Sequence, residues 1–386
     1  MKIQDSVPRP PLESAGSPNR AGETPMTHQD SPARPPKMAD VGRLAGVSAQ
    51  TVSRYFTGTG YVGAETRERI EAAIAELDYR LNQSARSLRV NATRTVGVLT
   101  TGPSLYGGWS TISGLNQAAA AAGYSLLSVQ LEADPAGSDA PDWMHRALDR
   151  FLSARVDGIV VSSSHPGIED LLERVWERVP VVILAGRSWP LADSATVDSY
   201  EAGVLATEHL VALGHERVLH LAGPEGVNEG VERERGYRDV LAAAGLPALP
   251  VPRGDWSAAS GAAIGERVDA GSFTAVFAGN DQMALGFMSA LRSRGLVPPG
   301  DYAIVGVDDM PDARFYSPAL SSVSMDFVGL GRAGFEMILH RIRSGERVPR
   351  RVIRPVLVPR ESTRASAGGT LPGRPAAPPP AVERSP

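Results

Sequence analysis

Apolar and polar positions alternate in long blocks over most of the chain after Thr95. Short apolar runs are separated by helical stretches of 10 to 20 residues. The runs lie at 96–99, 125–129, 158–161, 181–184, 218–222, 275–278 and 304–307. This alternation is typical of a parallel sheet covered by helices. The span is too long for one sheet of usual width, so the sequence predicts an α/β core of two Rossmann-like lobes, with a ligand at the carboxyl ends of the strands.

A different pattern occupies residues 39–56, where two short helices are predicted on either side of a tight turn. Asp40 is expected to cap the first helix, Gly46 to end it, and Ser48 to cap the second. A third helix at 65–77 would close a small three-helix core. Val41, Leu44 and Ala45 of the first helix fall at helical spacing, and Val52 of the second is expected to face the same core. Val47, in the turn, is expected to be buried there as well.

The second of these helices would expose side chains suited to DNA. Glutamine pairs well with adenine and arginine with guanine, while a hydroxyl or a helix N-terminus suits a backbone phosphate. The arrangement is that of a helix-turn-helix, although any two-helix hairpin with such a turn would look similar. The DNA contacts that we expect from this helix are Ser48, Ala49, Gln50, Ser53 and Arg54.

The order of these residues resembles the DNA-binding headpiece of the LacI/GalR family of transcriptional repressors. The segments that carry the resemblance are ADVGRLAGVSAQTVSRYF (39–56), TR (66–67), LDY (77–79), VALGH, GDWSAAS, NDQMALG and GVDDMP. The resemblance is nearly continuous over 39–363. It implies a sequence-specific DNA-binding regulator, most simply a repressor, whose periplasmic-binding-protein-like core crosses between its lobes near Val197, Val323 and Arg354.

Residues 82–93 read as a polar linker by composition alone. The resemblance implies instead a hinge helix that forms on operator DNA and pairs with its dimer mate in the minor groove. Leu88 would wedge between base steps there. Arg86 and Arg89 would contact phosphates or the minor groove. A plain tether is the alternative.

Polar and aromatic residues near the ends of the later predicted strands form a kit for binding a sugar. A carboxylate and an amide can take paired hydroxyls, an arginine can donate two more hydrogen bonds, and an indole covers the C–H face of a ring. The resemblance implies effector contacts at matching positions. The effector-binding residues that we expect are Arg233, Trp256, Asn280 and Asp308, together with Thr101 and Met325.

Three positions depart from the galactoside-binding pattern of the family. Ala185 stands where that pattern has an aspartate, Met325 replaces a glutamine, and Val197 replaces a phenylalanine. The sequence therefore predicts a different sugar as effector. A regulator of the same fold that uses a nucleobase or another corepressor remains the alternative, as does an activator.

The ends of the chain are rich in proline and poor in core residues, so both are expected to be disordered. The first could also be a DNA-binding arm, or translation could start at Met26 or Met38. The second shows no leucine heptads, so the tetramerisation helix of some family members is expected to be absent and the protein to be a homodimer. The predicted divisions are a tail at 1–37, a headpiece at 38–81, a hinge at 82–93, a core at 94–363 and a tail at 364–386.

Composition narrows the remaining function classes. The 386 residues carry a net charge of −4, so DNA affinity must come from a local surface. There is no cysteine, which excludes disulfides and thiolate metal sites. We expect a cytoplasmic protein with no membrane contact, because no export signal or long apolar run is present. We also expect no cofactor. The lack of a signal also argues against a transport binding protein.

An enzyme is the least expected class. The sequence has no Walker loop, no H-E-x-x-H and no G-x-S-x-G elbow, and its histidines show no metal-ligand spacing. G-x-G-x-x-G occurs at 58–63 and 329–334, but neither match follows a strand in a βαβ unit, so neither is expected to bind a dinucleotide.

Overall fold

The structure is a computed structural model that divides into two compact units, Met1–Asn82 and Gln83–Pro386. It describes residues 34, 36–80, 92–101, 105–131, 140–162, 173, 175–184 and 192–364. Nearly all of both predicted tails lies outside the described residues, as does the predicted hinge up to residue 91. None of the helices in the described part is both long and apolar enough to cross a membrane.

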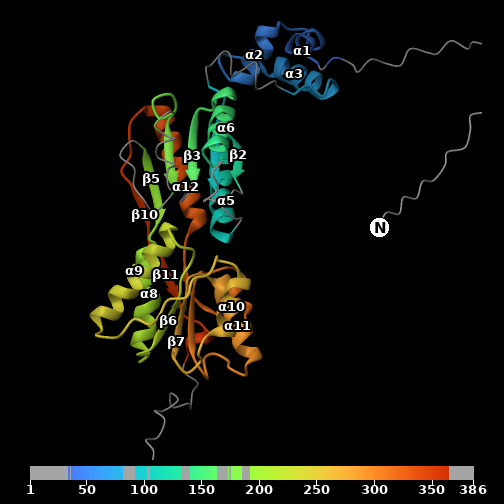
Figure 1. The fold of residues 1–386 in the computed structure, drawn as a ribbon. Helices are drawn as coiled ribbons and strands as arrows, with labels where there is room; N and C mark the ends of the chain where they lie inside the picture. The colour runs from blue at the N-terminus through green and yellow to red at the C-terminus, as the bar shows by residue number, and fades with distance from the viewer. Residues whose placement is uncertain are drawn as a thin grey trace, which may run out of the picture. The chain divides into compact units, whose positions relative to one another are not determined.

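The described part of the first unit contains three helices, α1 (Met38–Ala45), α2 (Ala49–Thr57) and α3 (Ala64–Glu76) (Figure 1). Their apolar faces meet in one small core because the buried positions recur at helical spacing. The buried members of this core are Val41, Ala45, Val52, Ile70, Ala73 and Tyr79. Leu44, which the pattern also placed on this face, is 46% exposed.

The turn between α1 and α2 is built as predicted, but the start of α1 is not. Gly46 ends α1 in the left-handed region with φ of 66°, and Ser48 caps α2 by accepting the amide of Thr51. The prediction that Asp40 is the N-cap is wrong. Lys37 occupies that position, and Asp40 lies three residues on, where its carboxylate accepts the Lys37 amide at 2.8 Å.

The first lobe of the second unit has a six-stranded, all-parallel sheet in the order β10-β5-β4-β3-β1-β2. Helices α5 (Tyr106–Ala121) and α12 (Phe327–Ser344) cover one face, and α6 (Ala140–Ser153) covers the other. The strands are β1 (Thr95–Thr101), β2 (Ser125–Leu131), β3 (Gly158–Ser162), β4 (Val181–Leu184), β5 (Asp193–Val197) and β10 (Arg351–Ile353).

The second lobe has a five-stranded sheet in the order β11-β9-β8-β7-β6, parallel except for β11. Its strands are β6 (Val218–Leu221), β7 (Ala275–Ala278), β8 (Ala303–Asp308), β9 (Ser321–Ser324) and β11 (Val356–Val358). Its helices are α8 (Ser199–Ala212) and α9 (Asn228–Ala243) on one face, with α10 (Ala258–Arg267) and α11 (Asp281–Ser293) on the other. Short 3-10 turns lie at Ala313–Phe315 and Glu361–Thr363. Each face of this sheet has its own apolar core beneath the helices that cover it. Alternate residues of β7 point into the one core or the other, as the pleat of a strand requires.

The chain crosses between the lobes three times, close to the predicted positions. It leaves β5 for α8 after Val197, leaves β9 for α12 beyond Ser324, and passes from β10 to β11 through Arg354. From the sequence alone, residues 351–359 are expected to form one last strand, but the structure has two, β10 and β11, which belong to different sheets. A helix is likewise expected from Ser324, but α12 begins at Phe327.

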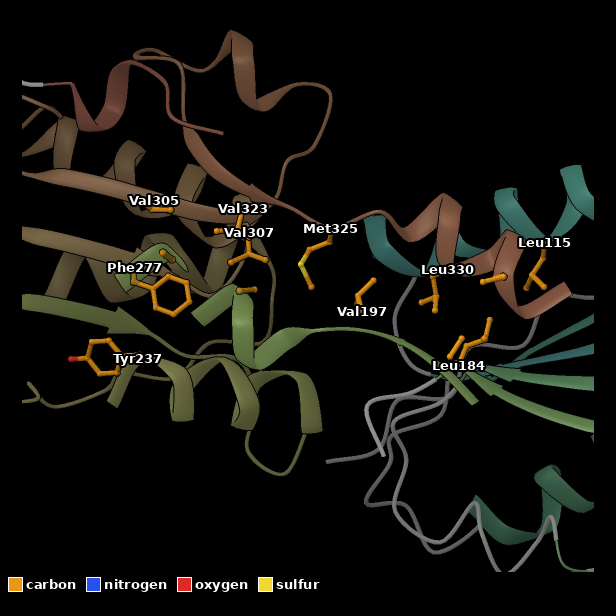
Figure 2. Packing of buried hydrophobic residues seen from close by; sticks show 14 of the residues in the cluster. Leu115, Leu184, Val197, Tyr237, Phe277, Val305, Val307, Val323, Met325 and Leu330 are labelled. Atoms are coloured by element: carbon orange, nitrogen blue, oxygen red, sulfur yellow. The ribbon is translucent and has the colours of Figure 1, made fainter. Parts of the chain in front are cut away.

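A continuous apolar core accompanies these crossings. Val197 and Met325 lie between core side chains of the second lobe, such as Val307 and Phe277, and those of the first, such as Leu330 (Figure 2). Met325 is 4% exposed. The crossing segments are therefore packed parts of the fold, so any relative movement of the lobes must repack these side chains.

Close packing of paired helices depends on glycine. A Cβ on Gly114 of α5 would lie 2.1 Å from the carbonyl oxygen of Val328 of α12, and a Cβ on Gly331 of α12 would lie 2.0 Å from that of Thr111. The same reciprocal arrangement joins α8 to α9 through Gly203 and Gly236, and α10 to α11 through Gly261 and Gly286. Each pair therefore packs backbone against backbone, which a side chain would prevent.

We predict that Gly114→Ala lowers the free energy of unfolding by about 1–3 kcal/mol or more, because the helices cannot both keep their positions. Gly108→Ala is a matched control in the same helix, where no atom lies within 4 Å of the added carbon. It should leave stability unchanged or raise it by up to about 1 kcal/mol. Guanidinium denaturation of the full chain measures both, and equal stability of the two variants would contradict the packing argument.

Candidate DNA-binding and effector sites

Helix α2 presents the predicted DNA-reading side chains on its outer surface. Gln50 and Arg54, one helical turn apart, are exposed, Ala49 is exposed beside them, and Ser53 is half-buried. The Ser48 hydroxyl accepts the Thr51 amide at 3.1 Å and shares a 2.9 Å hydrogen bond with the Thr51 hydroxyl. Gln50 and Arg54 are thus displayed by a capped, packed helix.

The other predicted DNA contacts cannot be placed. Leu88, Arg86 and Arg89 lie outside the described residues, and their roles stay predictions. The chain is described again from residue 92, and Asp157 fixes it just afterwards. The carboxylate of Asp157 accepts the amides of Thr93 and Arg94, each at 2.8 Å.

Three of the predicted effector residues come together at the carboxyl edge of the second sheet. Arg233 of α9 is 5% exposed, and its Nη2 lies 3.7 Å from Oδ1 of Asp308, the last residue of β8. Its guanidinium also lies over the ring of Trp256, 5.4 Å from the centroid, and donates to the carbonyl oxygen of Gly279 at 2.6 Å.

The separation between Arg233 and Asp308 leaves both groups with hydrogen-bonding capacity. A distance of 3.7 Å gives electrostatic attraction but is too long for a good hydrogen bond. Nε of Arg233 is buried without a partner, and no described residue donates a hydrogen bond to the Asp308 carboxylate. A donor and an acceptor therefore stand side by side, as paired hydroxyls require.

Trp256 is seated on backbone that carries no side chains. Cβ atoms on Gly223 and Gly279 would lie 2.1 Å and 3.0 Å from its indole. Trp256 itself has φ of 72° and is 8% exposed. Asn280 holds the backbone of Trp256, because Nδ2 donates to the Trp256 carbonyl oxygen at 3.0 Å while Oδ1 caps α11 by accepting the Met283 amide. The predicted ligand amide of Asn280 is thus already engaged in the fold.

The remaining predicted effector residues do not join this cluster. Thr101 is the last residue of β1 in the first lobe, and Met325 is a core residue of a crossing segment. Ala185, the position of one departure from the galactoside pattern, lies outside the described residues. The sequence therefore found one cluster and two more distant positions.

A second polar cluster lies behind the site. The sequence places Asp281 and Asp309 after predicted strands, among the positions where cleft residues are expected, but it assigns them no contact. Asp281, the first residue of α11, is fully buried and accepts hydrogen bonds from the Met310 amide and the Ser322 hydroxyl. Arg360 pairs with Asp309 at 2.5 Å. The only sequence signal for the role of Asp281 is the acid directly after the helix cap in NDQMALG. Acids are common at that position in exposed helices too, so the signal does not identify a buried carboxyl group.

Burial dominates the electrostatics of these acids. It raises the pKa of Asp308 to about 6, and the neighbouring Arg233 opposes that rise. It raises the pKa of Asp281 to about 8, with a further contribution from the charge of Asp308. Burial also lowers the pKa of His220 to about 4. Among the described residues no group of three or more His, Asp or Glu side chains could hold a metal ion.

Two family models match the chain. The model for bacterial regulatory proteins of the lacI family matches residues 37–82, and that for a periplasmic binding protein-like domain matches residues 207–363. The lactose operon repressor of Escherichia coli (strain K12) is 32% identical over 338 residues, which cover 86% of this chain and 92% of that protein.

Two further comparisons agree. The HTH-type transcriptional repressor PurR of Haemophilus influenzae (strain ATCC 51907 / DSM 11121 / KW20 / Rd) is 32% identical over 311 residues, 78% of this chain and 90% of that protein. The crystal structure of the lac repressor dimer bound to operator and the anti-inducer ONPF superposes with a TM-score of 0.77 at 31% identity, covering 86% of this chain and all of that one. The predicted fold class is thereby confirmed, while the roles of single residues stay predictions.

We predict that Asp308→Asn changes how stability depends on pH. Since the folded pKa of about 6 lies above the ordinary 3.8, folded Asp308 keeps a proton between these values that the unfolded chain releases. The free energy of unfolding therefore falls as pH rises through this window, and the variant should lack this part of the fall, up to about 1.4 kcal/mol per pH unit.

Denaturation at pH steps from about 4 to about 7 measures this difference. The contribution of His220, which is present in both proteins, cancels in the comparison. Parallel curves for the two proteins would contradict the assignment.

Proposed function

This chain belongs to the LacI family of bacterial regulatory proteins, and from that premise we propose that it is a dimeric repressor released from its operator by a small sugar. The family supplies the DNA-binding regulator as the class of protein. The sugar, the dimer and the residue roles are our proposal. The observation that carries the sugar is the Arg233–Asp308 pair beside the indole of Trp256.

The proposed DNA contact is made by two headpieces, one from each subunit. Each would place α2 in a major groove, so that Gln50 and Arg54 reach base edges. The structure of a related repressor as a dimer bound to operator supports this arrangement. We extend it to a hinge at 82–93, where Leu88 would act as a wedge between base steps and Arg86 and Arg89 would add phosphate contacts.

The remaining divisions belong to the same proposal. A headpiece at 38–81 reads DNA, and a core at 94–363 binds effector and dimerises in the cytoplasm. The tails at 1–37 and 364–386 take no part in either task. Lys37 is an exception at the boundary, because its amide completes the cap of α1.

The groups at the carboxyl edge of the second sheet suit a sugar chemically. Carboxylate and guanidinium groups 3.7 Å apart can accept from and donate to neighbouring hydroxyls. The indole supplies an apolar surface for the C–H face of the ring. A nucleobase corepressor is the second candidate, because a PurR repressor is as similar to this chain, at 32% identity, as the lactose operon repressor is. The aromatic ring and the arginine could also hold a purine.

Coupling between the two sites would run through the three crossings. An effector that draws the lobes together must repack Val197 and Met325, which lie between the two groups of core side chains. A coupling free energy of about 3 kcal/mol would weaken operator binding roughly 150-fold. By reciprocity, bound operator would weaken effector binding by the same factor.

We predict that Arg54→Ala weakens binding to the cognate operator by about 1–3 kcal/mol and relaxes base preference at one position of each half-site. Fluorescence anisotropy at fixed salt, on DNA from upstream of the gene, provides the measurement. Arg267→Ala, an exposed arginine of α10, is the control and should bind as the unaltered protein does. If Arg54→Ala distinguished sites as sharply as the unaltered protein, α2 would not be the reading helix.

We predict that Asp308→Ala abolishes the effector response and leaves effector-free operator binding intact, because Asp308 contacts the effector and not the DNA. The measurement is release of operator in the presence of lactose, D-galactose, D-glucose, cellobiose, D-ribose, hypoxanthine or guanine. Release of the unaltered protein by one sugar supports the proposal. Binding that only tightens, and only with a purine, supports the corepressor instead.

A further inference from the structure

The turn after β8 holds the effector-site carboxylate in a conformation that L-amino acids rarely adopt. Asp308 has φ of 107° and Asp309 has φ of 52°, and neither is glycine. Such residues persist only where surrounding contacts fix them. The turn therefore needs partners that hold its backbone.

Asp281 supplies those partners from the start of α11. Its Oδ2 accepts the amide of Met310 at 2.8 Å, and its Oδ1 accepts the hydroxyl of Ser322 at 2.6 Å. Ser322 in turn accepts the amide of Asp309 at 3.0 Å. Both backbone amides that follow Asp308 are thus tied to one buried carboxyl group.

Neighbouring residues leave space for the Asp281 carboxyl group and hold the turn after β8 in place. A Cβ on Gly306 of β8 would lie 2.1 Å from Oδ1 of Asp281, so only glycine leaves space for the carboxyl group. Arg360 holds the turn from outside, because it pairs with Asp309 at 2.5 Å and donates to the Leu320 carbonyl oxygen at 2.8 Å.

Asp281 is not needed to start its own helix. Asn280 already caps α11 by accepting the Met283 amide at 2.9 Å. Both hydrogen bonds of Asp281 go instead to the turn after β8 and to β9. The hydrogen bonds of Asp281 therefore stabilise the turn after β8 and not the start of α11.

We propose that Asp281 is a positioning residue of the effector site, which fixes the turn after β8 so that Asp308 faces Arg233, without touching the effector itself. The inference rests on the proposed effector site. It assigns the geometry of effector recognition to a side chain behind the site. Asparagine has the same shape and keeps an oxygen that can accept the Met310 amide, so it is a close substitute.

The first test needs no effector. Hydrogen exchange of the full chain, followed by mass spectrometry, should show the Asp309 and Met310 amides of Asp281→Ala exchanging at least about tenfold faster than in the unaltered protein. Asp281→Asn keeps an oxygen for the Met310 amide and should retain most of the protection. Asp193→Ala is the matched control, since Asp193 is a carboxylate of the first lobe that is 3% exposed. Unchanged exchange in Asp281→Ala overturns the proposal.

The second test separates positioning from general loss of structure. Calorimetric titration with the compound of the panel that acts on the unaltered protein should show at least about tenfold weaker binding to Asp281→Ala, and recovery to within about threefold in Asp281→Asn. Operator affinity without effector should not change. Faster exchange with unchanged effector affinity overturns the positioning role, as does equal weakening in Asp193→Ala.

Two outcomes are kept apart by this design. If the unaltered protein binds no compound of the panel, the proposed function fails and the exchange result alone decides whether Asp281 fixes the turn. If Asp281→Ala does not fold, Ser322→Ala provides the same readout, because it removes the acceptor of the Asp309 amide. Unchanged exchange of that amide in Ser322→Ala overturns the proposal.

Discussion

The buried guanidinium of Arg233 dictates the geometry of the second lobe's carboxyl edge. A charge removed from water must be paired and hydrogen-bonded, or its desolvation destabilises the fold. Arg233 obtains the Gly279 carbonyl oxygen, the face of Trp256 and the carboxylate of Asp308. Two of these partners require a residue other than glycine at positive φ. The strained backbone at this edge therefore places the partners of a buried charge, and that charge lies at the proposed effector site.

The packing of the scaffold extends this constraint to whole helices. A Cβ on Gly203 of α8 would lie 2.2 Å from the carbonyl oxygen of Arg233, and one on Gly236 of α9 would lie 2.4 Å from that of Tyr200. The helix that carries Arg233 is thus seated directly on α8. Since α8 also packs against β8 and β9, the positions of Arg233 and Asp308 are set within one rigid body.

The sequence predicted those parts of the fold that rest on apolar burial. Strands such as β7 and β8 are buried on both faces and read as apolar runs. It missed β5 and β9, whose sequences DSATV and SSVS are polar yet buried. Distant partners help to bury them, because Asp193 pairs with Arg347 and Ser321 shares a hydrogen bond with Thr363. The role of Asp281 could not be found from the local sequence, since its partner Ser322 lies 41 residues away. Arg233, Trp256 and Asp308 were found through resemblance, while local reasoning misplaced the cap of α1.

The three crossings also decide how this architecture can be inherited. Each lobe is discontinuous in the sequence, because α12 and β10 of the first lobe follow most of the second. A single recombination event between two related genes therefore cannot exchange one lobe without cutting the other. A crossover after Val197 would bring a foreign α12 against the native α5. The backbones of these helices touch at Gly114 and Gly331, so a side chain at either position would prevent their packing. New effector preferences are thus expected to arise by point substitution at the carboxyl edge and not by shuffling of lobes.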